Sequence, residues 1–250
     1  VEGQSSGSGG TGLVMYSGNG QVVPRGFPSD QPMRVRLTDS TGKAMAGATV
    51  AWAVATGSGM VSPRTSLTDE NGIAEAKYIG ASLVMPPTSW AEAKVTASVV
   101  NYDPVEFTMI TVPSLSSGSP AKPIYALVTP RAYSVVTGQA GQVLAGAVVV
   151  TAKALSGSKS GQGIPNVGVE VQSGLDPATN PSAACDAPGG AALSDATGTA
   201  TCNLRFGPVV GGPVAVTILV GGGGEGGAGT QYTVLITVTP GPPGEITILG

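Results

Sequence analysis

The sequence predicts an all-β protein made of two tandem β-sandwich domains. Glycine and proline are frequent, with 39 Gly and 20 Pro among 250 residues, and they divide the chain into short segments. Within these segments apolar residues recur at every second position, which is typical of strands with one buried face. The two halves of the chain also share motifs in the same order, which indicates a duplicated unit.

The predicted strands are defined by alternating apolar residues. In the first half the sets are Met33, Val35, Leu37; Val50, Trp52, Val54; Ala74, Ala76, Tyr78; Val95, Ala97, Val99; and Val105, Phe107, Met109. In the second half they are Val167, Val169, Val171; Ala200, Cys202, Leu204, Phe206; Val214, Val216, Ile218, Val220; and Tyr232, Val234, Ile236, Val238. Their spacing predicts sandwiches. Trp52 is the predicted aromatic centre of the first core. In the second half, Gly168 and Glu170 alternate with Val167, Val169 and Val171 and therefore belong to the opposite face of that strand.

Two motifs occur once in each half. Residues 41–47 lead into 48–52 as residues 160–166 lead into 167–171, and residues 66–74 match 192–200. The expected organisation is a flexible N-terminal segment (1–11), a first sandwich (12–113), a linker (114–121), a second sandwich with an insertion (122–240) and a C-terminal extension strand (241–250).

The second motif contains an Asp-x-x-Gly turn in both halves. Asp69 and Asp195 are expected to accept backbone N–H bonds in an Asx-type turn. Gly72 and Gly198 are expected to supply the positive φ at which the next strand begins. A calcium ligand set around Asp69, Glu70 and Asn71 is the alternative, although calcium needs six to eight oxygens and the second half offers only Asp195.

The first half resembles the bacterial immunoglobulin-like domain of the invasin and intimin type. The matching residues are Val50-x-Trp52, Gly57-Ser58-Gly59, the segment Leu67-Thr68-Asp69-x-x-Gly72-x-Ala74, and the strand at 95–99. The second half departs from this pattern, because Val171 stands where Trp52 would be and residues 176–190 form an insertion. The resemblance implies two tandem immunoglobulin-like β-sandwich domains that serve as rod segments or adhesive tips, without catalytic residues.

Composition argues against several classes of function. Only 11% of residues are charged and the net charge is −3, so the basic footprint of a nucleic-acid-binding protein is missing. The chain has no histidine, which removes the commonest general base and metal ligand. We therefore expect no enzymatic activity, no cofactor and no metal. No apolar run approaches the length of a transmembrane helix.

Three local features are candidates for further roles. Cys185 and Cys202 are the only cysteines and are expected to form a disulfide in an exported protein, two unpaired buried thiols being the alternative. Trp90 follows a Pro-Pro loop and is either a contact for a partner or a cap on the end of the sandwich. The glycine run at 221–229 is expected to form a hairpin loop, with close approach of another backbone as the alternative.

The predicted function is structural. We expect a secreted or surface-displayed bacterial protein that self-associates in a filament or sheath, or forms an adhesin stalk. The alternative is a recognition module for a glycan or host protein that uses loops 85–90 and 176–190. Glu245, Ile246, Thr247, Ile248 and Leu249 alternate after a Pro/Gly break and are either a donor strand for another copy or the start of a third module.

Overall fold

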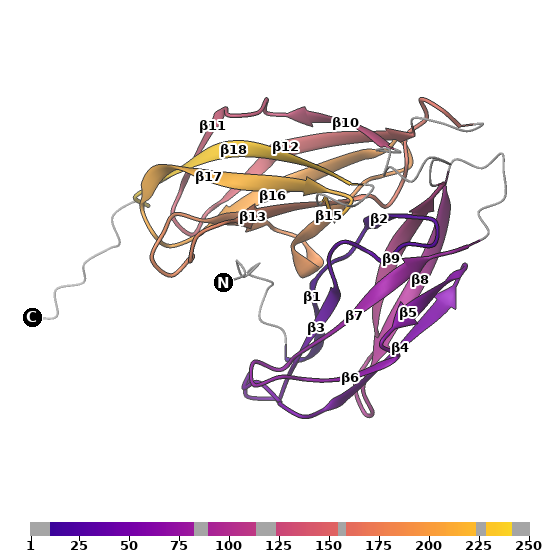
Figure 1. The fold of residues 1–250 in the computed structure, drawn as a ribbon. Helices are drawn as coiled ribbons and strands as arrows, with labels where there is room; N and C mark the ends of the chain where they lie inside the picture. Colours follow the sequence, from indigo (N-terminus) through magenta and orange to yellow (C-terminus); the bar gives the residue numbers. More distant parts are fainter. Residues whose placement is uncertain (1–10, 83–89, 114–123, 155–158, 224–228, 242–250) are drawn as a thin grey trace, which may run out of the picture.

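The computed structural model describes residues 11–82, 90–113, 124–154, 159–223 and 229–241. The first set of strands, which we call the first module, is β1 (Gly12–Ser17), β2 (Gln21–Pro24), β3 (Met33–Thr38), β4 (Thr49–Thr56), β5 (Gly59–Ser62), β6 (Thr65–Leu67), β7 (Ile73–Gly80), β8 (Ala91–Ser98) and β9 (Val105–Val112). The second module is β10 (Ile124–Thr129), β11 (Val135–Gln139), β12 (Val143–Ala154), β13 (Gly168–Ser173), β14 (Ala183–Cys185), the 3₁₀ turn η1 (Pro188–Gly190), β15 (Ala191–Leu193), β16 (Thr199–Phe206), β17 (Gly211–Val220) and β18 (Thr230–Thr239). Figure 1 shows the two modules as two separate stacks of strands.

Each module is a sandwich of one four-stranded and one five-stranded sheet. The strand orders are β1-β3-β7-β5 and β2-β9-β8-β4-β6 in the first module, and β10-β12-β16-β14 and β11-β18-β17-β13-β15 in the second. The two sets correspond strand for strand when nine is added to each number of the first. Even the exceptional parallel pairs correspond, because β2 runs parallel to β9 and β11 parallel to β18. The chain is therefore two tandem immunoglobulin-like β-sandwiches with one topology.

The two cores are filled differently. In the first module Trp52 is 3% exposed and its ring centroid lies 5.9 Å from that of Phe107. The Trp52 indole N–H donates to Ser66 Oγ at 2.9 Å, which satisfies the one polar group of the buried ring. At the equivalent position the second module has Val171, which packs among aliphatic residues and the two cysteines.

The paired Asp-x-x-Gly motifs fold into the same five-residue turn. Asp69 Oδ1 accepts from the backbone N–H of Asn71 and Ile73, and Asp195 Oδ1 accepts from that of Thr197 and Thr199. Gly72 has φ +75° and Gly198 has φ +80°, a region that side chains other than glycine rarely adopt. A third turn of this kind, at residues 39–43, was not predicted.

The prediction missed the strands without a long apolar alternation. These strands, which have between three and six residues, are β1, β2, β5, β6, β11, β14 and β15. All seven lie at a sheet edge, where one neighbour suffices. The alternation did not predict β12 either. A register shift between Leu144 and Val148 interrupts its alternation.

Candidate functional site at the junction of the two modules

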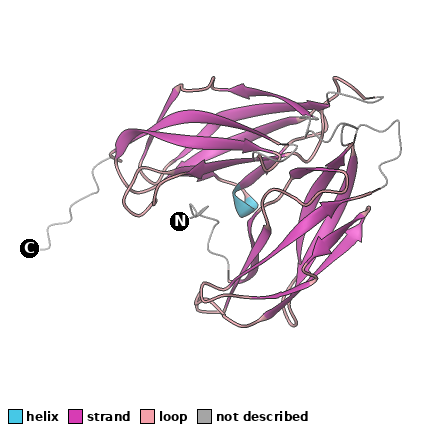
Figure 2. Ribbon diagram, in the orientation of Figure 1, coloured by secondary structure: helices cyan, strands magenta, loops and turns pink. Residues whose placement is uncertain are grey.

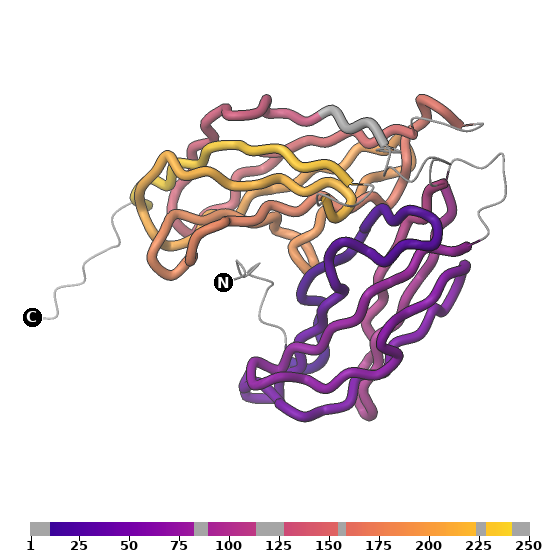
Figure 3. The backbone as a smooth tube through the Cα atoms, in the orientation of Figure 1, coloured from indigo at the N-terminus to yellow at the C-terminus, as the bar shows by residue number. Residues whose placement is uncertain are grey.

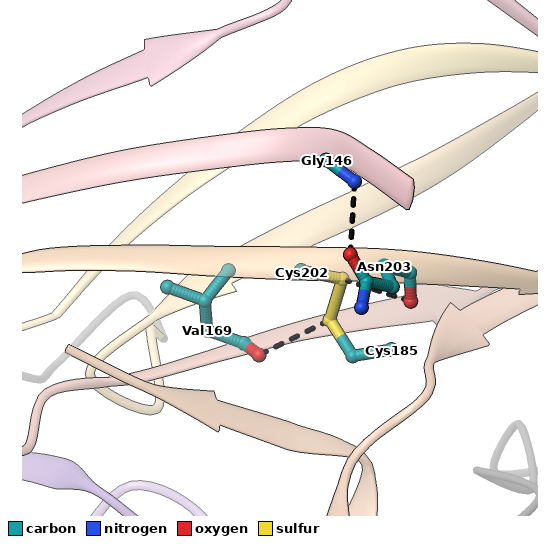
Figure 4. Close-up of a disulfide and its surroundings, with 5 residues drawn as sticks. All are labelled: Gly146, Val169, Cys185, Cys202 and Asn203. Atoms are coloured by element: carbon teal, nitrogen blue, oxygen red, sulfur yellow. Dashed lines mark hydrogen bonds between the residues drawn. A yellow bond between two sulfur atoms is a disulfide. The ribbon is translucent and has the colours of Figure 1, made fainter. Parts of the chain in front are cut away.

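The predicted disulfide is present in the second module. Cys185 on β14 and Cys202 on β16 are bonded, with Cα atoms 5.2 Å apart. Figure 4 shows the sulfur atoms between β16 and Val169 of the opposite sheet, whose carbonyl oxygen lies 3.3 Å from Cys185 Sγ. Both cysteines belong to the core cluster. The bond therefore fixes the C-terminal part of the insertion to the interior of the module.

The insertion leads from this disulfide to the other module. Asp186 forms an ion pair with Arg205 at 2.9 Å, and η1 follows directly. Gly189 has φ +62°, and a Cβ atom placed on it would lie 2.7 Å from Met15 Cγ of β1, so a larger residue would require strain and a shift of the Met15 side chain. Figure 2 shows η1 in cyan between the two modules.

Backbone hydrogen bonds join the modules directly. Val22 N–H donates to Gly221 O at 2.9 Å, and Gly168 N–H donates to Gly20 O at 2.8 Å. A Cβ at Gly20 would collide with the backbone of Gly168, and one at Gly168 would collide with Asn19 O. In Figure 3 this part of the chain, in indigo, runs beside the orange and yellow strands of the second module. β17 and β18 pair as a hairpin across the glycine run, up to Val220 opposite Thr230, and Gly221 at the start of the run also provides the close backbone approach that was the alternative.

The turn that enters the junction is held by buried amides. Asn19 Oδ1 accepts from Thr108 N–H at 2.8 Å. Gln21 Nε2 donates to Gly18 O at 3.0 Å and to Gln31 O at 2.9 Å. Both side chains are buried, and their hydrogen bonds fix the turn in one shape before it meets the second module.

Glu170 lies at the centre of this contact. Its neighbours Val169 and Val171 point into the core of the second module, so Glu170 points to the outer face of the sheet. The alternation correctly predicted that face but implied exposure, and Glu170 is only 8% exposed. Its cross-strand neighbours Leu219 and Ala191 are also buried. The first module covers this patch, a burial that no pattern within one strand reveals.

The buried carboxyl has a donor from each module. Gly18 N–H of the first module donates to Glu170 Oε1 at 3.2 Å, and Gln172 Nε2 of the second lies 3.5 Å from Glu170 Oε2. Burial raises the pKa of Glu170 from its usual 4.5 to about 7, although both donors favour the charged form. The protonated form is thus the one that the docked arrangement favours near and below neutral pH.

Two further contacts lie at the periphery of the junction. Asn166 Nδ2 donates to Glu92 Oε2 at 2.9 Å. Lys159 Nζ lies 4.6 Å from the centre of the Trp90 ring, within the range of a cation–π contact. Trp90 is half-buried and packs against the core cluster of the second module. It therefore makes a contact within the molecule, and a role toward an external partner stays a prediction.

Apolar packing continues from one module into the other. Val22, Ile110 and Val112 of the first module belong to the core cluster of the second. Together with the backbone hydrogen bonds, this makes the junction more like a protein interior than like the polar contacts common between domains.

A groove of about 260 Å³ lies in the first module. It lies between β4 and β5, which belong to different sheets, and is lined by Trp52, Ala53, Val54, Gly59, Met60, Val61 and Arg64. Met60 and the nearby Leu67 are 57% and 64% exposed. The groove can hold an apolar side chain but brings no pair of carboxylates together.

Within the described residues, no three His, Cys, Asp or Glu side chains gather as a metal site would require. Asp69, for which calcium was the alternative, uses Oδ1 in its own turn. The Thr197 hydroxyl is the main cause that holds the pKa of Asp195 below its usual value, which fits the same turn role. In the same ranges, no helix has the length and apolar character of a membrane span. Residues 245–249 lie outside the described residues.

The chain is similar in structure to known proteins, but its sequence matches no known family. No family model and no curated protein matches the chain. Among solved structures, it is similar to the D0-D1 domain of Intimin (13% identity, 91% of this chain, 96% of that one, TM-score 0.36) and to the periplasmic chaperone SfaE (13%, 91% and 100%, TM-score 0.32). The CupB2 chaperone of Pseudomonas aeruginosa is similar at 13% identity over 86% of this chain and 97% of that one, with a TM-score of 0.32. The fold assignment rests on the strand order described above.

Proposed function

We propose that this chain is a non-enzymatic structural segment of a bacterial surface or extracellular protein, in which two immunoglobulin-like modules act as one stiff unit. The observation that carries the proposal is the junction. Backbone hydrogen bonds and a shared apolar core resist bending, as a stalk or filament subunit requires. A structural disulfide fits an oxidising compartment. The same bond fixes the insertion that reaches the junction.

Rigidity and location test this proposal. Small-angle scattering of the full chain should fit a single arrangement of the modules, whereas a broad distribution of interdomain distances would contradict the stiff unit. Protease treatment of intact cells should remove the protein, and thiol labelling before reduction should find no free cysteine. Protection from external protease with both thiols reactive would place the protein inside the cell and overturn the proposal.

The finer proposal is assembly by strand donation, with residues 245–249 of one copy pairing with an edge strand of another. Low charge supports it, because edges without charged residues are poorly protected against pairing. Electron microscopy of the native material should show fibres, and truncation after Thr239 should abolish them. Equal assembly by the truncated chain would exclude donation, and single rods from the full chain would favour a stalk segment.

Recognition of a host protein or glycan is the second candidate, and the β4–β5 groove favours it. Exposed Met60 lines the groove together with Trp52, Val54 and the cation Arg64, a combination that suits a partner group with both apolar and polar parts. Screening of labelled full chain on glycan arrays and host matrix proteins should find a ligand whose binding is lost in Met60→Asp. Leu175→Asp, an equally exposed apolar position in the other module, is the control and should still bind.

A further inference from the structure

We propose that the junction is a pH-sensitive joint, in which protonation of Glu170 keeps the two modules docked and its ionisation loosens them. The inference concerns the coupling between the modules and does not depend on which structural role the chain has. It starts from geometry: a carboxyl on the outer face of one module is covered by a backbone turn of the other.

Among the residues that the structure describes, no basic side chain pairs with the Glu170 carboxyl. Among the described strands packed around β13, the titratable side chains are Tyr16 on β1 and Arg205 on β16, apart from the disulfide. Arg205 is paired with Asp186. Arg34, whose backbone lies opposite Ser17 in the β1–β3 pairing, forms an ion pair with Glu75 at 2.9 Å. Burial raises the pKa of Glu170, the two neutral donors oppose that rise, and no charged group contributes to the shift.

Separation of the modules would return Glu170 to water. Gly18 N–H would be withdrawn and the outer face of β13 would be exposed, so the pKa would fall to its usual value near 4.5. Docking thus takes up a proton between pH 4.5 and 7. The docking constant is at its maximum below pH 4.5, falls as the pH rises toward 7, and is lower by about two orders of magnitude above it.

Because the chain has no histidine, the pH dependence of docking that comes from Glu170 can be separated from the titration of other groups. Between about pH 5.5 and 8.5 an ordinary protein titrates mainly its histidines and its α-amino group, and this chain has no histidine. With histidine excluded, a change of the junction in that window that disappears when Glu170 is replaced by glutamine reports on Glu170 rather than on the α-amino group.

Amide hydrogen exchange of the full chain tests the joint. The amides of Val22 and Gly168 donate across the junction, whereas that of Ala152 donates to Gly198 within the second module. After correction for the intrinsic exchange rate, protection of Val22 and Gly168 should fall about 100-fold between pH 5 and 8.5, and protection of Ala152 should not. In Glu170→Gln the fall should disappear, whereas Glu92→Gln, which changes the exposed carboxylate at the same junction, should retain it.

Two outcomes would overturn the joint. One is protection of Val22 and Gly168 that does not depend on pH in the unmodified chain, and the other is an equal fall in Glu170→Gln. If Glu170→Gln does not fold, the test is an NMR titration of the unmodified chain that follows the chemical shift of the Glu170 side-chain carboxyl carbon with pH. A midpoint near 7 that coincides with a shift of the Gly18 amide supports the joint, and a midpoint near 4.5 refutes it.

Discussion

In the first module, Ala51, Ser98 and Thr65 lie together on the outer face of the five-stranded sheet, and all three are exposed. In the second module the equivalent residues are Glu170, Leu219 and Ala191, and all three are buried. The same position of one fold thus faces water in one copy and a protein neighbour in the other. The comparison teaches that duplication supplied the sandwich, whereas the sequence of this one face determines how the copies join.

The two modules also differ in the side chains that fill their cores. The first module packs the aromatic pair Trp52 and Phe107, whereas the second combines aliphatic residues with Phe206 and a disulfide. Both solutions fill the space between two sheets of the same topology, because packing requires volume and complementary shape rather than particular residues. The following variants test these differences, from the largest expected effect to the smallest.

Trp52→Ala should cost about 3–5 kcal/mol of unfolding free energy, because it removes the largest side chain of the first core. Val171→Ala, at the equivalent position, should cost about 1.5–3 kcal/mol. Urea unfolding followed by circular dichroism measures both. Equal losses would mean that the aromatic pair is not the centre of the first core.

Replacement of both Cys185 and Cys202 by alanine should cost about 3 kcal/mol, as estimated for a closed loop of this length. The sequence separation is 17 residues. Thermal unfolding with and without a reducing agent provides the control, since the reductant should destabilise the unmodified chain and leave the double variant unchanged. A reductant effect of similar size on both would assign the loss to something other than the disulfide.

Gly20→Ala and Gly26→Ala separate backbone strain from the junction contact. Both glycines have positive φ, +70° and +78°, so both variants carry similar strain. Only at Gly20 would the new methyl group meet the other module, whereas nothing lies within 4 Å at Gly26. Gly20→Ala should therefore cost about 1–3 kcal/mol more and broaden the interdomain distances in small-angle scattering. Equal costs with unchanged scattering would show that the close approach at Gly20 is unimportant.

Ala51 holds the position in the first module that Glu170 holds in the second. Ala51→Glu therefore places a carboxyl at the same position of the fold, on a face that no other module covers. Stability should change by less than about 0.5 kcal/mol, and the new carboxyl should titrate at an ordinary value because water surrounds it. NMR titration of the labelled glutamate measures this. A strongly raised pKa at residue 51 would show that the sheet itself, rather than the neighbouring module, shifts the pKa of Glu170.

Much of the fold followed from local patterns. Alternation located the long central strands β3, β4, β7, β8, β16, β17 and β18, because each has one face in a core and the side-chain period of a strand is two. The Asp-x-x-Gly turns were predictable for a different reason: Asp69 and Asp195 bond to residues two and four positions further along. The disulfide was predictable because Cys185 and Cys202 are the only two cysteines of the sequence.

The amino-acid sequence by itself determined the class of fold, the duplication and the turns, since these depend on interactions between near neighbours or on periodicity along one strand. The tertiary structure alone decided that Glu170 is buried, that Gly20 and Gly168 touch, and that Trp90 lies beside Lys159. These contacts join residues that are far apart in the chain, with 152 positions between Gly18 and Glu170. A strand pattern reports which face a residue occupies, but only the placement of the second sandwich against the first determines whether that face meets water or protein.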